Sequence, residues 1–335
     1  MFRKILPFVL AIAVLVAACS SDSGSTTSTD QPTTTTTVAV TTTAAAPTTT
    51  EANTTTSAVV DGGFPVTIEA INGFVTLEER PERIVSISPT STEVLFAVGA
   101  GDQVVAVDDQ SNYPADAPMT DLSAFTPNVE AIASYDPDLV LISFDPSDVI
   151  ASLEAIGIPV VLHPAALTPQ EAYEQWVQIG VVTGHTDESL EVVADTSASI
   201  AESVSSLPEG TDSLSYYYEL DPTLYSLTSS TFVGELIALT LMTNIADPAD
   251  EEGFGYPQLT AEYIVDASPS MLYLADTKCC GQTAETVAER PGWDAIPAVA
   301  NGDVVELDDD IASRWGPRIA ELVDTVAQSI VGMDQ

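Results

Sequence analysis

Tyrosine side chains in the second half of the chain are the first candidates for chemistry. Tyr216, Tyr217 and Tyr218 are consecutive, so on a strand Tyr217 points away from the face of its neighbours, and Tyr225 follows shortly after. Aromatic rings exposed in a pocket suit a corrin, a porphyrin or a catecholate by stacking and apolar contact, whereas rings in a core only pack. Tyr218 and Tyr225 are therefore candidate ligand-binding residues, with core packing as the alternative for each.

Basic residues are so scarce that their positions are informative. The chain has 8 Lys and Arg against 50 Asp and Glu, with a net charge of -42, yet Arg314 and Arg318 share one loop–helix junction. A guanidinium offers a planar fork for carboxylate, phosphate or catecholate oxygens. We expect Arg314 to bind ligand and Arg318 to be structural. The alternative is that both arginines form ion pairs with Asp308–Asp310.

The chain contains three cysteines, an odd number. One of them, Cys19, belongs to a targeting segment described below, which leaves the adjacent pair Cys279 and Cys280. In an oxidising compartment this pair could form a vicinal disulfide. Two buried thiols or a thiolate metal site are the alternatives, and the metal site lacks an accompanying Cys or His pair.

Patterns typical of catalysis are missing from the sequence. Its two histidines, His163 and His185, both lie beside expected turns and are predicted to be structural. There is no Gly-x-Ser-x-Gly, no Walker loop and no His-Glu-x-x-His. We predict a binding protein that is not an enzyme, with no cofactor and no metal site of its own. The acidity excludes nucleic acid as a partner, because binding it would cost too much repulsion.

The first residues indicate export. Arg3 and Lys4 precede an apolar run from Leu6 to Val16, which has the dimensions of a signal peptide and not of a membrane span. The run ends in Val16-Ala17-Ala18-Cys19, which looks like a bacterial lipobox, so residues 1–18 are predicted to be a lipoprotein signal and Cys19 the lipidated residue. Residues 19–60 are rich in Thr, Ser and Pro without an apolar face, and are predicted to be a disordered tether.

Alternating strand and helix patterns follow the tether. They predict an N-terminal αβ lobe over residues 61–168 and a C-terminal αβ lobe over residues 211–335, each with a mostly parallel sheet. Connecting helices occupy residues 169–210 between the lobes. One of them, from Asp187 to about Leu207, keeps an apolar stripe at helical spacing over about 30 Å. The fold class is therefore α/β, with two lobes joined by a single long spine helix and a ligand cleft between them.

Short motifs in a fixed order carry a resemblance to a known family. From Arg80 to Gly332 the chain resembles the bacterial vitamin B12 and ferric-siderophore binding proteins, which are helical-backbone solute-binding proteins of ABC importers. The matching segments are Arg80–Pro89, Thr92–Gly101, Asn112–Pro114, Pro127–Ile132, Asp136–Val140, Gly157–Val160, Tyr256–Glu262, Pro291–Trp293, Asn301–Val304 and Ser313–Arg318.

The resemblance implies a function. It implies a monomeric, lipid-anchored protein on the extracytoplasmic face of the cell membrane, which hands a small molecule to a permease driven by a cytoplasmic ATPase. We expect a metal complex that carries its own iron or cobalt: first a ferric siderophore or similar iron complex, then cobalamin or another corrinoid, then haem. An exported interaction module that does not serve transport is the alternative from a different class.

The resemblance also implies site residues. Tyr256 matches an aromatic residue that lines the ligand cleft, and Asp310 with Arg314 matches a polar pair near the ligand. Phe125 and Phe144 lie within a residue of two cleft tryptophans of the family, so here Phe stands where Trp is usual. Glu130 and Glu262 match one surface glutamate per lobe that pairs with permease arginines, although a Glu at a helix N-terminus is also favoured by the helix dipole alone.

Overall fold

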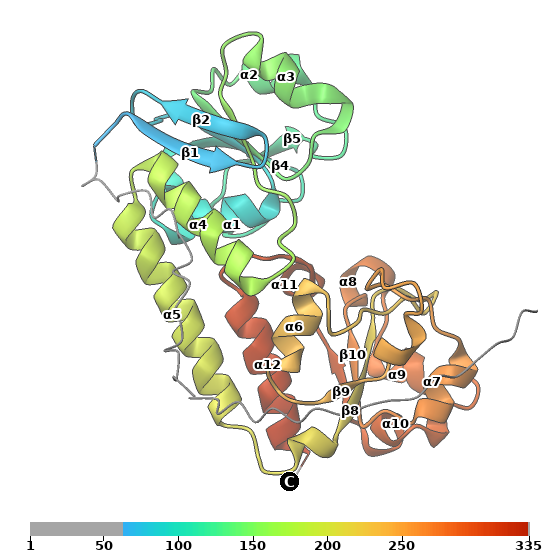
Figure 1. Cartoon of the computed structure of the whole chain (residues 1–335). Helices are drawn as coiled ribbons and strands as arrows, with labels where there is room; N and C mark the ends of the chain where they lie inside the picture. The colour runs from blue at the N-terminus through green and yellow to red at the C-terminus, as the bar shows by residue number, and fades with distance from the viewer. Residues whose placement is uncertain (1–62, 334–335) are drawn as a thin grey trace, which may run out of the picture. The chain divides into compact units, whose positions relative to one another are not determined.

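The computed structural model describes residues 63–333 (Figure 1). The predicted signal peptide, Cys19 and the whole predicted tether lie outside the described residues. Within the described part, no helix combines the length and apolar character that a membrane crossing requires.

The N-terminal lobe is built on a five-stranded parallel sheet in the order β5-β4-β3-β6-β7. Central strands β3 and β6 are buried along their whole length, which explains why their sequences are nearly continuous apolar runs. An antiparallel hairpin, β1–β2, docks on β7 through Asn72, whose amide donates to the carbonyl of Val160 at 2.9 Å and whose oxygen accepts from the Leu162 amide at 3.0 Å. The elements are β1 (Val66–Ala70), β2 (Gly73–Leu77), β3 (Ile84–Ile87), α1 (Pro89–Ala97), β4 (Val104–Asp108), β5 (Met119–Leu122), α2 (Val129–Ala133), β6 (Leu139–Ile142), α3 (Val149–Glu154) and β7 (Val160–Leu162).

The C-terminal lobe contains a four-stranded parallel sheet in the order β11-β10-β8-β9. Tyr216 and Tyr218 of β8 pack in one core cluster and Tyr217 in another, as the predicted alternation of faces requires. The segment 224–227 makes a single bridge, between Tyr225 and Gln258, and Leu224 adopts a left-handed conformation at φ 69°. The elements are β8 (Ser215–Glu219), α6 (Phe232–Ala238), β9 (Thr243–Asn244), α7 (Ala261–Ala267), β10 (Met271–Leu274), α8 (Thr277–Cys280), α9 (Ala284–Ala288), α10 (Pro297–Asn301), β11 (Val304–Glu306) and α11 (Asp309–Ser313).

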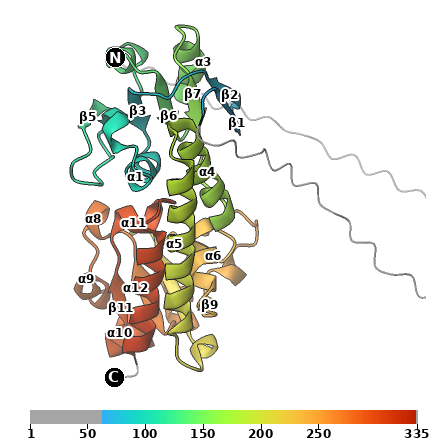
Figure 2. The same ribbon diagram turned by 90° about the vertical axis from the view of Figure 1, so that its left-hand side faces the viewer.

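Three helices brace the lobes: α4 (Pro169–Thr183), α5 (Thr186–Ser205) and α12 (Ile319–Gly332), of which α5 lies beside the other two (Figure 2). The predicted long helix is α5, which packs on α4 and α12. Helix α4 contacts both lobes, since it packs on α1 and β1 and also on α6. Its Trp176 is fully buried and donates from the indole nitrogen to the carbonyl of Trp315 at 2.9 Å. Helices α4 and α12 thus flank the long helix α5.

Close packing of α4 against α5 depends on one glycine. A Cβ at Gly180 would lie 2.2 Å from the hydroxyl oxygen of Ser189 and 2.8 Å from the carbonyl oxygen of His185. The two helices thus approach more closely than any larger residue permits. One apolar cluster runs from the N-terminal sheet through these helices into the C-terminal sheet, and each lobe adds a second cluster on its other sheet face. The lobes share a core along the spine.

Candidate functional site

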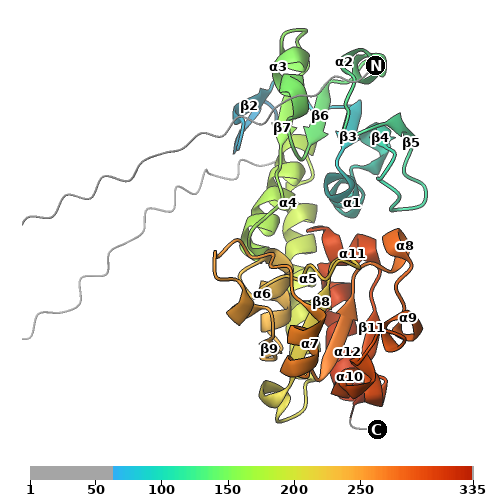
Figure 3. The same cartoon turned by 90° about the vertical axis from the view of Figure 1, so that its right-hand side faces the viewer.

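Five of the candidate site residues follow the carboxyl ends of parallel strands. Phe125 follows β5, Phe144 follows β6, Tyr225 follows β8, and Asp310 and Arg314 follow β11. The segments after β4 and β11 meet, because the Asn112 amide donates to the Asp310 carboxylate at 3.1 Å. The carboxyl edge of each sheet therefore faces the other lobe (Figure 3). The carboxyl edge of a parallel sheet is where α/β proteins usually bind ligands.

Arg314 lies at the meeting point of the lobes. Its side chain is only 9 % exposed, and its two terminal nitrogens donate to both lobes. They contact the Glu93 carboxylate at 2.9 Å, the Asn112 side-chain oxygen at 3.0 Å, the Gln110 carbonyl at 3.0 Å and the Asp310 carboxylate at 2.7 Å. Intramolecular partners thus occupy the fork that we expected Arg314 to offer to a ligand.

Glu93 is the residue that sequence reasoning missed. It lies on α1, is 3 % exposed, and accepts from both Arg314 and Arg318 of the C-terminal lobe. Arg318 also stacks its guanidinium over the Tyr113 ring, 4.1 Å from the centroid. Among so many acidic residues Glu93 is inconspicuous in the sequence. The one feature that could have identified it is its position beside Val94 and Leu95, on a helix that is buried over most of its length. We call Glu93, Gln110, Asn112, Asp310, Arg314 and Arg318 the interlobe seam.

Lys278 extends the seam on the C-terminal side. Its ammonium group contacts the carboxylates of Asp308 and Asp310, the latter at 2.8 Å. Burial acts to raise the pKa of Asp310, but hydrogen bonds from Lys278 and Asn112 outweigh it and hold that pKa below its ordinary value. Asp310 is thus a charged acceptor that joins Lys278, Arg314 and the N-terminal lobe.

Aromatic residues lie exposed near these edges. Phe125 and Phe144 are 70 % and 39 % exposed, and their ring centroids are 6.0 Å apart. Tyr225 and Tyr256 are 41 % and 54 % exposed, and their segments are joined by a bond from the Ser226 amide to the Pro257 carbonyl at 2.9 Å. Large exposed rings of this kind can pack on a bulky ligand.

Tyr218 does not join this group. Its side chain is 0 % exposed, its hydroxyl donates to the Ala312 carbonyl at 3.3 Å, and burial raises its pKa. The prediction of a ligand contact is wrong for Tyr218 in this structure, because both faces of β8 are covered.

The remaining predicted residues are accessible. Glu130 and Glu262 are exposed in the first turns of α2 and α7, after the capping residues Asn128 and Thr260. Cys279 and Cys280 are exposed at the end of α8 and are joined in a disulfide. The alternative of two buried thiols is therefore not supported, and no group of His, Cys, Asp and Glu among residues 63–333 is arranged to hold a metal ion.

A buried acid, Asp276, directly precedes α8. Asp276 is 0 % exposed and neither of its carboxylate oxygens has a hydrogen-bond partner. Burial raises its pKa to about 7, helped by the nearby Glu219, which is itself bound by Arg290 through two contacts of 2.6 Å. Asp276 therefore holds a proton in mildly acidic solution.

Comparison with known proteins decides the family. The family model described as "Periplasmic binding protein" matches residues 84–311. The chain belongs to this family. The predicted resemblance is confirmed, and so is the fold of two αβ lobes with mostly parallel sheets and a long connecting helix.

Individual relatives agree with this assignment. An uncharacterized ABC transporter substrate-binding lipoprotein of Bacillus subtilis is 33% identical, over 80% of this chain and 86% of the relative. A cobalamin-binding protein of Halobacterium salinarum is 30% identical, over 79% of this chain and 74% of the relative. The crystal structure of a possible iron-binding (periplasmic solute-binding) protein from Staphylococcus epidermidis superposes with a TM-score of 0.65 at 26% identity, covering 75% of this chain and 99% of the other.

Glu93→Gln tests the interlobe seam of this periplasmic binding protein. Removing the charge leaves two nearly buried guanidinium groups short of an acceptor, so the free energy of unfolding should fall by about 3 kcal/mol. Chemical denaturation measures the change. The same exchange at exposed Glu130 is the control and should stay within about 0.5 kcal/mol of the parent; equal effects at both positions would refute a special role for Glu93.

Asp276→Asn tests the buried acid. Because the pKa of Asp276 is raised from 3.8 to about 7, the folded protein binds more protons than the unfolded chain between those values, and its stability falls as pH rises through this window. Asparagine stays neutral, so at pH 8 the variant should exceed the parent in unfolding free energy by about 1 to 3 kcal/mol, a gain that shrinks towards pH 4. Urea titrations at pH 4, 6 and 8 measure this. Exposed Asp195→Asn is the control, and a pH-independent difference for Asp276→Asn would contradict the assignment.

Proposed function

We propose that this periplasmic binding protein captures a bulky metal complex of little or no negative charge outside the cell, a corrinoid of the cobalamin kind, and delivers it to an ABC importer. One observation supports this choice of ligand: the cationic side chains near the facing edges already have carboxylate partners. Lys278 is paired with Asp308 and Asp310, and Arg314 and Arg318 with Glu93.

The net charge of each ligand class then decides how well it fits this acidic surface. A strongly anionic ferric siderophore would meet an acidic surface and would have to break existing ion pairs to gain a cation. A neutral corrinoid needs none, and its large apolar faces suit exposed Phe125, Phe144, Tyr225 and Tyr256. The similarity to a cobalamin-binding protein at 30% identity supports the same ligand. This reverses the order expected from the sequence, in which an iron complex came first.

An iron complex without net negative charge is the second candidate. The similarity to a possible iron-binding protein at 26% identity favours it. Haem has less support, because neither histidine is placed to be its axial ligand. His163 is buried against Gln178, and burial lowers its pKa to about 4. His185 is bonded to Arg80 and Gln103. Only tyrosines such as Tyr225 and Tyr256 would remain as axial ligands. In each case the metal is cargo that arrives within its complex.

The proposal includes no catalysis. Two acids in the described part have strongly raised pKa values, Asp108 at about 6 and Asp276 at about 7, and burial is the main cause for both. Both side chains are 0 % exposed, so neither meets a substrate. An exported interaction module without transport has no comparable support, since its relatives would not be expected among solute-binding proteins.

Delivery is proposed to use Glu130 and Glu262, with the protein held at the membrane by lipid on Cys19. The two glutamates occupy equivalent places, one in the first helical turn of α2 and one in that of α7, and both are exposed. Exposed carboxylates in both lobes suit contact with basic residues of a permease. Cys19 lies outside the described residues, so the anchor is inferred from the sequence.

Binding of cyanocobalamin tests the ligand. At about a hundredfold excess over the dissociation constant it should stabilise the full chain by about 2.7 kcal/mol, seen as a raised thermal midpoint. Tyr256→Ala should weaken binding about tenfold by removing aromatic contact, whereas Phe74→Ala, which removes another exposed ring on β2, should not. Stabilisation by ferrichrome and not by cyanocobalamin would shift the assignment to the iron complex, and tight binding of an anionic catecholate siderophore would refute the charge-based ranking.

Uptake of labelled cyanocobalamin by cells that depend on this protein tests delivery. Replacing Glu130 and Glu262 together by Gln should reduce uptake about tenfold or more while the affinity for ligand stays unchanged, because only the permease contact is lost. Glu191 and Glu202 replaced together by Gln, two exposed positions on α5, form the matched control. Cys19→Ala should also reduce uptake, but by releasing the protein into the medium. Normal uptake by the Glu130/Glu262 variant would exclude these residues from docking.

A further inference from the structure

The disulfide between Cys279 and Cys280 has no role in the site described so far. It ends α8, the four-residue helix that begins three residues after β10. Both cysteines are exposed, as is Lys278 before them. A disulfide is apolar and lacks hydrogen-bond donors, so here it forms a small apolar surface among carboxylates. Its place after the carboxyl end of a central strand puts it at the same sheet edge as Asp310 and Tyr225.

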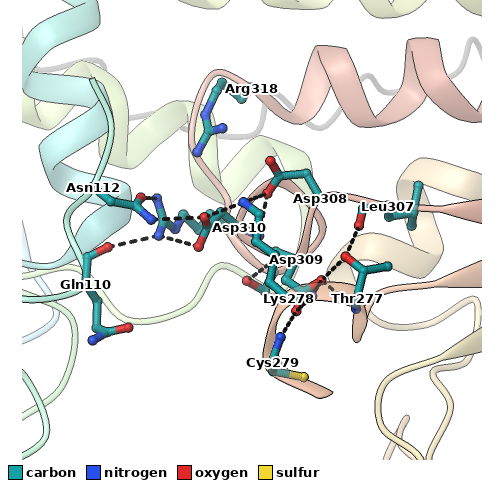
Figure 4. Close-up of polar contacts among 12 residues, drawn as sticks. Gln110, Asn112, Thr277, Lys278, Cys279, Leu307, Asp308, Asp309, Asp310 and Arg318 are labelled. Carbon is teal, nitrogen blue, oxygen red and sulfur yellow. Dashed lines mark hydrogen bonds and ion pairs between the residues drawn. The ribbon is translucent and has the colours of Figure 1, made fainter. Parts of the chain in front are cut away.

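The backbone of the turn that carries the disulfide is held by hydrogen bonds to Asp309. The Asp309 carboxylate accepts three consecutive backbone N–H groups, those of Thr277, Lys278 and Cys279, at 2.8 to 3.0 Å (Figure 4). The Thr277 hydroxyl adds bonds to Asp309 and to the Leu307 carbonyl, both at 2.8 Å. The backbone of α8 is thus attached to the start of α11, and the disulfide closes its last two residues into one small ring. These hydrogen bonds and the disulfide together fix the conformation of the turn.

The turn is also connected to the N-terminal lobe. Lys278 donates to Asp310 at 2.8 Å, and Asp310 accepts from Asn112 at 3.1 Å and from Arg314 at 2.7 Å. Asp310 alone therefore bridges Lys278 of the disulfide-bearing turn and Asn112 of the opposite lobe. A ligand placed between the facing edges meets this turn next to the seam.

We infer that the Cys279–Cys280 disulfide is a contact surface for the captured ligand and that its reduction weakens capture. This rests on the proposed function, whose ligand lies between the facing edges. A flat apolar pair of sulfurs suits the edge or face of a large ring system, and a pre-ordered turn binds without an ordering cost. Reduction opens the ring, frees both side chains to rotate and replaces the apolar surface by two thiols.

The reduction is ordinary thiol–disulfide exchange with a dithiol. A thiolate of the dithiol attacks one sulfur of the pair, the S–S bond breaks, and a mixed disulfide forms while the other cysteine leaves as a thiolate. The second thiol of the reagent then displaces the first cysteine. The protein gains two electrons and two protons as two thiols, and the reagent leaves as its own cyclic disulfide. Exposure of both cysteines makes the bond accessible to such a reagent.

The test compares redox states of the full chain carrying Cys19→Ala, so that Cys279 and Cys280 are the remaining cysteines. Dithiothreitol reduces one sample, which is then desalted under argon so that no reductant contacts the ligand, and alkylation with mass spectrometry counts its free thiols. Binding of cyanocobalamin and of ferrichrome is measured by calorimetry. The reduced form should bind about tenfold more weakly than the oxidised form, because the turn must now be ordered on binding. Cys279→Ser with Cys280→Ser should bind like the reduced form and should not respond to dithiothreitol.

Each other outcome has a definite meaning. Equal affinities of the oxidised and reduced forms would overturn the inference and leave the proposed function standing. A response of the double serine variant to dithiothreitol would overturn it too, since the effect would then arise elsewhere. If neither probe binds in either redox state, the proposed function is wrong and the inference fails with it. Thermal unfolding of both forms separates a local effect from a general loss of stability.

Discussion

A buried carboxylate shared by two arginines holds the arrangement of this protein. Glu93 comes from the N-terminal lobe, and Arg314 and Arg318 come from a single turn of the C-terminal lobe. Charges this far from solvent are costly unless each is paired, so the contact is stable only when both lobes are in register. The polar edges that could receive a ligand are positioned by this contact on one side and by the shared apolar core along α4, α5 and α12 on the other.

Lys and Arg are scarce in this chain, so the use of two arginines to bind Glu93 takes up a large share of its basic side chains. In the described part, Arg290 binds buried Glu219, Lys278 binds Asp308 and Asp310, and Arg83 donates to the carbonyls of Tyr135 and Asp136. The few basic side chains thus serve mainly to neutralise or fix specific groups inside the fold, and the surface is left acidic. Solubility and recognition are then decided by carboxylates and exposed rings, which limits the ligands that such a protein can accept.

The sequence predicted the architecture because periodicity is a local property. Alternating strand and helix patterns indicated two parallel sheets, and the stripe along residues 187–207 indicated the long helix, since each depends only on neighbouring residues. Partners across the lobes were not predictable in the same way. Arg314 was expected to bind ligand, yet Glu93, one of its two carboxylate partners, lies 221 residues away, and no local pattern identifies such a pair. Tyr218 was misplaced for a related reason, because coverage of both faces of β8 depends on helices distant in sequence.

The helical pair has a consequence for transport kinetics. Gly180 lets α4 and α5 pack in close contact, and α4 holds Trp315 of the other lobe through its own Trp176. Two lobes braced in this way have little freedom to swing, so empty and loaded copies should offer a permease nearly the same docking surface. Empty copies would then compete with loaded ones for the transporter. The ratio of this protein to its cargo, as well as its affinity, would set the rate of import.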